Sequence, residues 1–177
     1  RVLVPLLRTL GERLDTVVLS HRDLDHTGGA RAVLDMQAQA ALSSSLEPGH
    51  ALVQQRPGTR CEAGQRWQWD GVDFEVLHPQ AADYGAAVAK KSNALSCVLR
   101  IGSAHGTHAL LAGDIETAQE SRLVSTGAPL SADWLLVPHH GSKTSSSDAF
   151  LAAVQPGVAL VQAGYRNRFG HPAPSVV

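Results

Sequence analysis

The chain has 177 residues, enough for one domain with a well-buried core. Hydrophobic residues make up 44% of it and charged residues 18%, as in an ordinary soluble globular protein. The formal net charge of -1 excludes the global basic footprint of a dedicated nucleic-acid-binding protein. A catalytic domain that obtains positive charge from metal ions needs no such footprint. No apolar run approaches about 18 residues and no stretch has the pattern of a signal peptide, so we expect neither a membrane span nor a leader.

Short helices and strands alternate along the chain. The predicted elements, in chain order, are a helix over 2–10, a strand over 14–19, a helix over 30–39, a hairpin over 65–77, a second hairpin over 95–112, a helix over 115–125, a strand over 134–137, a helix over 147–154 capped at its start, and a strand over 158–162. The pair Asp70-Gly71 is a strong signal for the turn of the first hairpin. Because hairpins interrupt the alternation, we expect a layered α/β arrangement with mixed sheets rather than a doubly wound parallel sheet. The absence of repeats and linkers predicts a single domain over residues 1–177.

A dense group of metal-ligand residues follows the first predicted strand. His21, Asp23, Asp25 and His26 form an H-x-D-x-D-H pattern in a loop that ends at two glycines. In an extended loop residues two apart point the same way, so the first three can converge on one side while His26 turns with Asp25. Imidazole and carboxylate are the usual nitrogen and oxygen ligands of divalent ions. A solvated polar loop would also contain such residues, but rarely four of them within six positions.

Two further predicted strands end in residues of the same types. Asp114 follows the strand before it in a Gly-Asp pair, although an Asp in this position is also a common helix N-cap. His139 and His140 follow the strand over 134–137 and precede a glycine. Three strand ends that carry His and Asp predict one shared edge of a sheet, where active sites collect.

These segments resemble a known family. The H-x-D-x-D-H pattern is similar to the H-x-H-x-D-H motif of the metallo-β-lactamase superfamily, with Asp23 in place of the second histidine. The segments 20–29, 110–116 and 137–147, together with the Phe-Gly-His-Pro ending of 167–172, resemble the C-terminal domain of the ComEC family of DNA-uptake proteins. The resemblance covers almost the whole chain and implies an αββα sandwich with two divalent metal ions at its edge.

The resemblance also implies a set of ligands. They are His21 and Asp23 for the first ion, Asp25 and His26 for the second, Asp114 as a bridge, and one of His139 and His140 to complete the second site. Many superfamily members supply a further histidine where this chain has Asn-Ala-Leu-Ser over 93–96. Because carboxylate replaces imidazole at Asp23 and that histidine is missing, we expect manganese to be favoured, with zinc as the alternative.

The implied reaction is the metal-assisted hydrolysis of a phosphodiester, with Asp25 and Asp114 in catalytic roles. Lys143 is a candidate clamp for phosphate, against the alternative of a solvated surface lysine. His171 is a candidate proton donor or substrate contact, against a role in fixing its loop. Trp67, Trp69 and Phe74 alternate around the first hairpin and are interpreted as core residues rather than a platform for stacking bases.

The resemblance implies a nuclease-like domain of an inner-membrane DNA channel, on the extracytoplasmic side, with DNA as substrate and the channel as partner. The proposed role in that family is degradation of the strand that is not transported. A hydrolase of small esters or phosphoesters on the same fold, and a non-catalytic module that binds DNA or a partner, are the alternatives. Compared with the family, the chain lacks the first hairpin and the last segment, so we expect a domain that is incomplete at both ends. Its two cysteines make at most one disulfide, and Cys97, within an apolar run, is interpreted as a small core residue.

Overall fold

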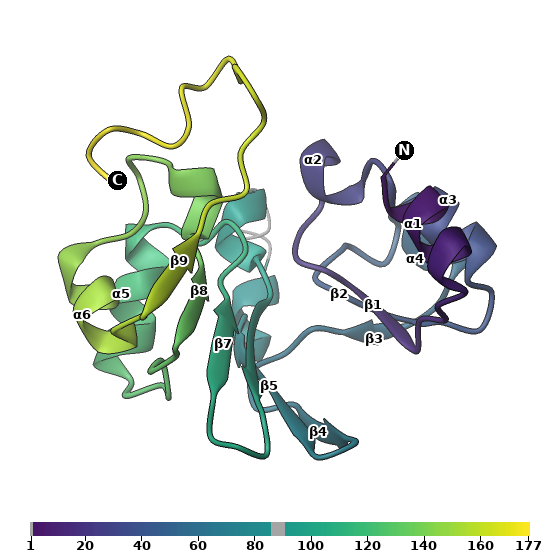
Figure 1. Cartoon of the computed structure of the whole chain (residues 1–177), viewed down its shortest axis with the longest axis horizontal. Coiled ribbons are helices and arrows are strands. Elements are labelled where there is room, and N and C mark those ends of the chain that lie inside the picture. Colours follow the sequence, from purple (N-terminus) through teal and green to yellow (C-terminus); the bar gives the residue numbers. More distant parts are fainter. Residues whose placement is uncertain (1, 86–90) are drawn as a thin grey trace. The chain divides into compact units, whose positions relative to one another are not determined.

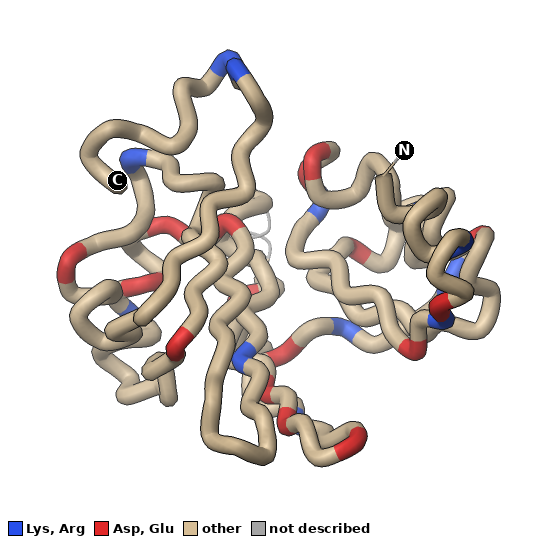
Figure 2. Tube along the Cα trace, in the orientation of Figure 1, with Lys and Arg blue, Asp and Glu red and all other residues tan. Residues whose placement is uncertain are grey.

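The computed structural model describes residues 2–85 and 91–177 (Figure 1). The chain forms two compact units, Arg1–Cys61 and Glu62–Val177, each with a sheet and helices of its own. Lys and Arg are scattered along both units rather than gathered in one broad patch (Figure 2). Among the described residues, no helix is both long enough and apolar enough for a membrane crossing.

The first unit is built on a three-stranded parallel sheet. Its order is β1 (Thr16–Leu19), β2 (Ala41–Ser44), β3 (Thr59–Arg60), and its helices are α1 (Leu3–Leu10), α2 (Leu24–Thr27), α3 (Ala30–Met36) and α4 (Ala51–Gln55). Buried Leu34 and Leu42 pack in its core. As predicted, α1 ends at Leu10, and Gly11 after it adopts the left-handed conformation that glycine tolerates.

Helix α3 is shorter than the predicted helix over 30–39. It ends where Gln37 leaves the helical conformation. The buried amide of Gln37 donates to the carbonyl of Glu12 and accepts from the N–H of Leu14. Because these hydrogen bonds satisfy the backbone of the preceding loop, they favour termination of the helix at this residue.

The second unit is built on a six-stranded mixed sheet. The strands, in spatial order, are β4 (Arg66–Trp69), β5 (Val72–His78), β6 (Val98–Gly102), β7 (His108–Leu111), β8 (Trp134–Leu136) and β9 (Val158–Leu160). The first four are antiparallel, and β7, β8 and β9 are parallel. The helices are α5 (Thr117–Ser125) and α6 (Asp148–Val154), with 3-10 turns η1 (Ala81–Tyr84), η2 (Ser92–Leu95) and η3 (Pro138–Gly141). Both predicted hairpins and the mixed sheet are confirmed, and the carboxyl ends of β7 and β8 lie at one edge.

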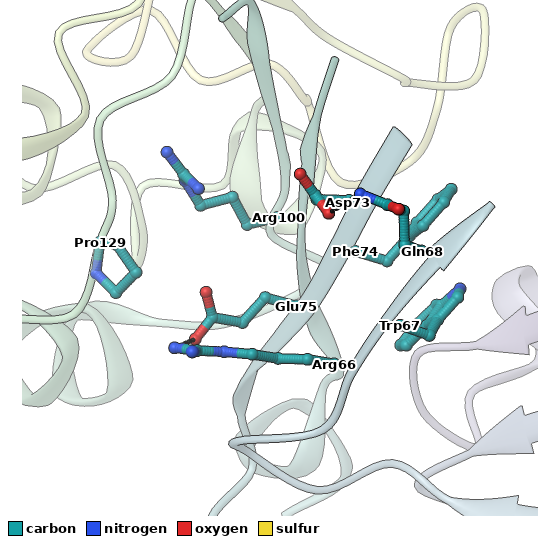
Figure 3. Close-up of a pocket in the computed structure, with 8 residues that line it drawn as sticks. All are labelled: Arg66, Trp67, Gln68, Asp73, Phe74, Glu75, Arg100 and Pro129. Atoms are coloured by element: carbon teal, nitrogen blue, oxygen red, sulfur yellow. Dashed lines mark hydrogen bonds and ion pairs between the residues drawn. The ribbon is translucent and has the colours of Figure 1, made fainter. Parts of the chain in front are cut away.

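The β4–β5 hairpin has two different faces. Arg66 and Glu75 project from one face, beside Arg100 of the neighbouring strand β6, and Trp67 projects from the other (Figure 3). Arg66 pairs with Glu75 at 2.6 Å, so charges on the polar face neutralise each other. Trp67 stacks on Phe74 with ring centroids 5.1 Å apart, but Trp69 is 43% exposed. The prediction that all three aromatic residues are core is therefore wrong for Trp69, because β4 is an edge strand.

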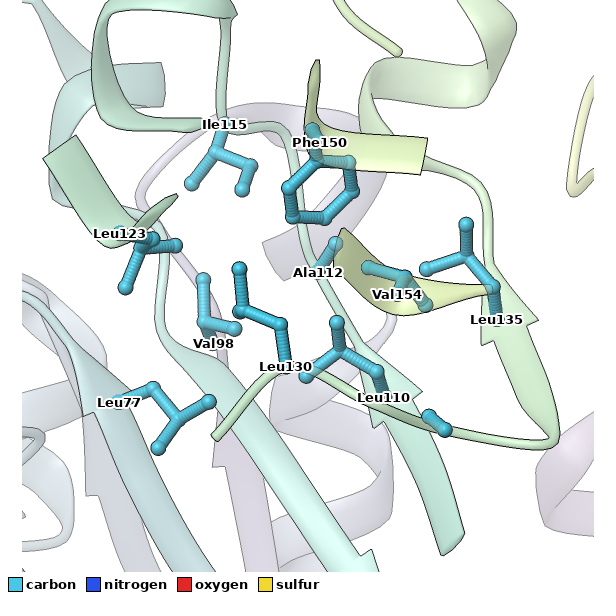
Figure 4. Close-up of a cluster of buried hydrophobic side chains, with 11 residues drawn as sticks. Leu77, Val98, Leu110, Ala112, Ile115, Leu123, Leu130, Leu135, Phe150 and Val154 are labelled. Carbon is cyan, nitrogen blue, oxygen red and sulfur yellow. The ribbon is translucent and has the colours of Figure 1, made fainter. Parts of the chain in front are cut away.

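The core of the second unit lies between its sheet and the helices α5 and α6 (Figure 4). Leu110 and Leu135 from the sheet meet Phe150 and Val154 from α6, and all four are fully buried. Each such side chain contributes about 1.5–3 kcal/mol of hydrophobic free energy when it is buried completely. This core fixes the ends of β7 and β8 relative to one another.

A partly buried cluster of polar side chains joins β5 to α5. Arg122 donates to both carboxylate oxygens of Asp83 at 2.6 and 2.7 Å and to Nδ1 of His78 at 3.2 Å. Nε2 of His78 donates to the carbonyl of Ala94 at 2.9 Å, and this hydrogen bond fixes the tautomer of the imidazole. Burial lowers the pKa of His78. Burial alone would raise the pKa of Asp83, but hydrogen bonds from Arg122 and from the N–H of Gln80 lower it overall.

Acid should therefore destabilise the second unit in two steps. Both groups have a lower pKa in the folded state than in the unfolded state, so the unfolded state binds more protons and stability falls with pH. The His78 contribution is lost as pH falls below the ordinary histidine value of 6.5, and that of Asp83 as pH falls below its ordinary value of 3.8. At neutral pH we expect Asp83→Asn to cost about 1–2 kcal/mol, because the half-exposed Arg122 is partly solvated. Urea titrations from pH 7 to 3 measure both steps. Asp70→Asn, the same change at an exposed turn, should leave them unaltered.

Candidate metal centre

The first group of predicted ligands lies at the end of β1. His21 is 1% exposed, and its Nε2 lies 3.5 Å from Oδ2 of Asp23. Nε2 of His26 lies 3.9 Å from Oδ2 of Asp25. The expectation of an extended loop through Asp25 is wrong, because α2 begins directly after Asp23, whose carbonyl accepts the N–H of His26 at 3.0 Å. The helical turn gives Asp25 and His26 a direction that an extended chain would not.

Ser20, which no sequence argument singled out, lies between the two imidazoles. Its Oγ is 3.0 Å from Nδ1 of His21 and 3.0 Å from Nδ1 of His26. A hydroxyl oxygen has two lone pairs and can accept a hydrogen bond from both Nδ1–H groups. That arrangement leaves the imidazole lone pairs on the Nε2 atoms, which are common metal-binding atoms of histidine. The polar residue that precedes the motif is the only sequence signal for this role.

The second group of predicted ligands lies where β7 and β8 end. Asp114 is 4% exposed, and its Oδ2 lies 3.4 Å from Nε2 of His140. The N–H of His139 donates to the carbonyl of Gly113 at 3.0 Å, so the two strand ends are joined by a backbone hydrogen bond. The second unit thus brings together Asp114 and His140 from two separate strand ends.

The tautomer of His140 provides a test of whether this pair suits a cation. Nδ1 of His140 lies 2.7 Å from the carbonyl oxygen of Gln162, which can only accept, so Nδ1 carries the proton. In neutral imidazole the lone pair is then on Nε2, which faces the Asp114 carboxylate. Two electron-rich atoms in this arrangement favour a cation or a proton between them. A histidine that donates its other N–H to a backbone carbonyl is the usual arrangement around a metal ion. The donor set therefore suits a divalent cation.

His139 has different partners. Asn93 approaches its Nε2 at 3.4 Å, and Oγ1 of Thr144 lies 3.2 Å from its Nδ1. The Thr144 hydroxyl in turn donates to Glu116 at 3.1 Å. Both ring nitrogens of His139 thus face the hydrogen-bonding side chains of Asn93 and Thr144, whereas Nε2 of His140 faces the carboxylate of Asp114.

The alternative role of Asp114 as a helix cap is wrong. Helix α5 begins after Glu116, whose carboxylate accepts the N–H of Gln119 while the Gln119 side chain accepts the N–H of Glu116 at 3.2 Å. This capping box satisfies the first turn without Asp114. The backbone N–H of Asp114 donates instead to Oγ of Ser96 at 3.0 Å.

Lys143 and His171 lie on two different loops of the second unit. Lys143 is exposed on the loop after the histidine pair. The ring of His171 lies 5.8 Å from that of His139 and stacks on Phe169 at 5.8 Å. Burial lowers the pKa of His171, as do the nearby His139 and His140.

The histidine pair is held in a conformation of the backbone that non-glycine residues rarely adopt. His139 has a φ of 48° and His140 a φ of 55°, and Gly141 follows with a φ of 76°. Each non-glycine residue in the left-handed region costs about 1–3 kcal/mol and persists only where its surroundings hold it. Serine and glutamate side chains hold this loop. Ser145 donates to the carbonyl of Pro138 at 2.9 Å, and buried Glu120 accepts from two N–H groups farther along.

We expect Gly141→Ala to disrupt this loop. A Cβ at Gly141 would lie 2.7 Å from Cβ of Pro172, in addition to the strain of a positive φ. The cost should be about 2–4 kcal/mol, from strain and the steric clash together. Gly157→Ala is the matched control, because its Cβ would meet only the carbonyl oxygen of Asp133 at 3.6 Å. Urea unfolding of the two variants measures the difference, and equal stability would contradict the prediction.

Comparison with known proteins gives a consistent set of relatives. The chain is 41% identical over 180 residues to a competence protein, ComA, of Neisseria gonorrhoeae, covering 98% of the chain and 24% of that protein. It is 34% identical over 175 residues to recombination protein 2 of Haemophilus influenzae, covering 99% of the chain and 21% of that protein. The chain matches one domain of the competence proteins. It spans less than a quarter of the length of these curated relatives, and no model of a protein family matches it.

Solved structures give the fold. A metallo hydrolase of the archaeon Ignicoccus hospitalis superposes with a TM-score of 0.51 at 19% identity, over 82% of this chain and 61% of that one. A metallo-β-lactamase of Cronobacter sakazakii gives a TM-score of 0.49 at 17% identity, over 73% of this chain and 59% of that one. The predicted metallo-β-lactamase fold is confirmed, with mixed sheets and helices in place of a doubly wound sheet.

Proposed function

We propose that the chain is a metal-dependent phosphodiester hydrolase that cleaves DNA as part of a DNA-uptake protein. The observation that carries this proposal is the pairing of Asp114 with the metal-binding tautomer of His140 at the carboxyl ends of two parallel strands. The similarity to competence proteins supports DNA as the substrate. In this proposal the domain degrades the strand that is not transported.

We propose that the ligand residues predicted from the sequence hold two divalent ions. His21 and Asp23 would hold one ion, and Asp25 and His26 the other. Asp114 would bridge the two, and His140 rather than His139 would complete the second set. Four carboxylate or imidazole ligands from the short segment 21–26 and two from separate strand ends suit such a centre. The share of oxygen ligands favours manganese over zinc.

When bound, a pair of divalent ions supplies an activated water and neutralises charge that develops on the phosphoryl oxygens. The residues of this chain bind and orient the substrate around it. Lys143, exposed beside the histidine pair, would attract a phosphate oxygen. His139, which Asn93 and Thr144 orient, and His171, whose ring lies beside it, would contact the scissile group or its leaving oxygen.

Incubation with single-stranded and double-stranded DNA tests the proposal, with manganese, magnesium or zinc supplied separately. We expect cleavage with manganese that Asp25→Ala abolishes. Asp25 has a largely exposed side chain, so its replacement should leave the fold intact. Turnover of small esters alone would favour another hydrolase of this fold, and DNA binding without turnover would favour a binding module. Activity with zinc alone would contradict the metal ranking.

We further propose an extracytoplasmic location beside a membrane channel. Neither cysteine is a free thiol, and Cys97 is buried as predicted, with 4% exposure. Disulfides persist in oxidising compartments and are rare in the cytosol. If thiols are blocked at the moment of cell lysis, mass spectrometry should find both cysteines oxidised in the full-length protein. Alkylated cysteines would contradict this location.

A further inference from the structure

A loop beside the second ligand group exposes two aromatic residues with two arginines between them in the sequence. This loop, residues 164–170, follows β9. Tyr165 is 89% exposed and Phe169 is 65% exposed. The guanidinium of Arg166 lies 5.3 Å from the centre of the Tyr165 ring, and that of Arg168 lies 4.8 Å from the centre of the Phe169 ring. The basic pair is visible at the tip of the loop (Figure 2).

The 164–170 loop is braced, so the exposure of its aromatic rings belongs to an ordered conformation. The amide of Asn167 donates to the carbonyls of Gly164 and His171 at 2.9 and 2.6 Å. Its oxygen accepts the N–H groups of Phe169 and His171 at 3.2 and 3.0 Å. One side chain therefore makes four hydrogen bonds across the loop. A surface that is ordered before binding loses less conformational entropy when a ligand arrives.

Residues that flank the 164–170 loop on both sides lie beside the histidine pair. At the start, the carbonyl of Gln162 accepts the Nδ1 proton of His140 at 2.7 Å. At the end, His171 stacks on Phe169 and lies 5.8 Å from the ring of His139. A ligand on the exposed rings of this loop would therefore lie beside the groups that the proposed reaction uses.

The local charge differs from that of the whole chain. Residues 149–177 contain two arginines and no aspartate or glutamate, whereas the chain has a net charge of -1. Each arginine presents a planar group that can bind phosphate in a bidentate manner or stack on a ring. The loop thus combines cations for a polyanion with largely exposed aromatic rings for planar groups.

We infer that the 164–170 loop binds a single strand of nucleic acid, with bases on Tyr165 and Phe169 and phosphates on Arg166 and Arg168. This inference rests on the proposed function and specifies its substrate. Unstacked bases offer faces to aromatic side chains, whereas the bases of a duplex are stacked on one another. In the sequence both arginines lie between the two aromatic residues, so a strand with bases on both rings would bring its intervening phosphates toward the guanidinium groups.

Binding measured without hydrolysis tests the inference. The ligand is a fluorescently labelled oligothymidylate, and the buffer contains EDTA so that no cleavage occurs. We expect Tyr165→Ala and Phe169→Ala each to weaken binding by about 5- to 150-fold, the usual contribution of one stacked base. Trp69→Ala, which removes an exposed aromatic ring from the β4–β5 hairpin, is the matched control and should change affinity by less than about 2-fold. Tyr165→Phe keeps the ring and should bind as the parent does.

Salt dependence tests the arginines separately. Replacing Arg166 and Arg168 together by alanine should reduce the slope of log affinity against log salt by about 1.4, since each phosphate contact on a single strand contributes about 0.7. Equal binding of a duplex, an unchanged slope, or equal losses from Trp69→Ala and Phe169→Ala would overturn the inference. If DNA is not cleaved with any metal but the loop variants still lose binding, the inference stands and the hydrolase proposal fails. If single strands are cleaved and their cleavage is unchanged in the loop variants, the hydrolase proposal stands and the inference about the loop fails.

Discussion

Asp114→Asn is expected to abolish high-affinity metal binding while the fold remains intact. Asparagine has the same shape as aspartate, and the hydrogen bond from the backbone N–H of residue 114 to Ser96 does not involve the carboxylate. The variant loses the negative charge that faces Nε2 of His140, and its amide can donate to that nitrogen instead. Loss of a residue that only orients a ligand costs about 10- to 100-fold in affinity, so loss of the proposed bridging ligand should cost more than about 100-fold. Isothermal titration with manganese and with zinc measures it.

The two histidines provide the control. His139→Asn and His140→Asn both introduce asparagine, which, like histidine, tolerates the left-handed backbone found at these positions. We expect His140→Asn to lose metal binding as Asp114→Asn does, and His139→Asn to keep it within about 10-fold. Equal losses at both positions would contradict the assignment of His140, and unchanged affinity in Asp114→Asn would remove the basis of the proposed centre.

The sequence predicted those parts of the site that depend on local order. Three segments can be recognised in the sequence because an apolar run stops abruptly at residues of metal-ligand types. They are the end of β1, the Gly-Asp pair after β7 and the paired histidines after β8. Whether Asp114 caps a helix was open, although the Glu116-x-x-Gln119 spacing of a capping box lies two residues farther on. The helical turn at α2 was not expected, because a four-residue helix has too few positions to show periodicity.

Contacts between distant residues could not be read in the same way. Glu120 accepts backbone N–H groups 26 and 27 positions away, and nothing in its own neighbourhood marks it as more than a helical residue. The choice between His139 and His140 depends on Gln162 and Asn93, which lie far from the pair in sequence. The strands β2 and β3 were not predicted, because strands of four and two residues are too short to show a clear pattern. Residue types that can bind a metal are recognisable in the sequence, but their hydrogen-bond partners can be identified only from the folded structure.

Glu120→Gln is expected to destabilise the second unit through the loop that carries the histidine pair. The Glu120 side chain is fully buried, and its two oxygens accept the N–H groups of Ser146 at 2.6 Å and Ser147 at 2.9 Å. Glutamine can present one oxygen to these donors, but its NH2 group then faces the other N–H. Hydrogen bonds to a charged group contribute about 1.5–3 kcal/mol each, and a buried donor left unsatisfied adds a penalty, so we expect a loss of about 2–4 kcal/mol. Thermal unfolding should shift down by about 5–15 °C.

Ser147→Ala tests whether the start of α6 is stabilised by the Ser147 hydroxyl, as its N-cap position suggests, or by the Glu120 carboxylate. Ser147 occupies the N-cap position of α6, where loss of a capping hydroxyl costs about 1 kcal/mol. Its hydroxyl makes no capping hydrogen bond, and its Oγ is buried without a hydrogen-bond partner among the described residues. Replacing Ser147 by alanine should therefore change stability by less than about 0.5 kcal/mol, since it removes a buried polar atom that gains nothing in the fold. If Ser147→Ala cost as much as Glu120→Gln, the serine hydroxyl would be the cap. The smaller cost would mean that the serine hydroxyl contributes little, and that the Glu120 carboxylate holds the chain directly before α6, at the end of the loop in which the strained histidines lie, through the N–H groups of Ser146 and Ser147.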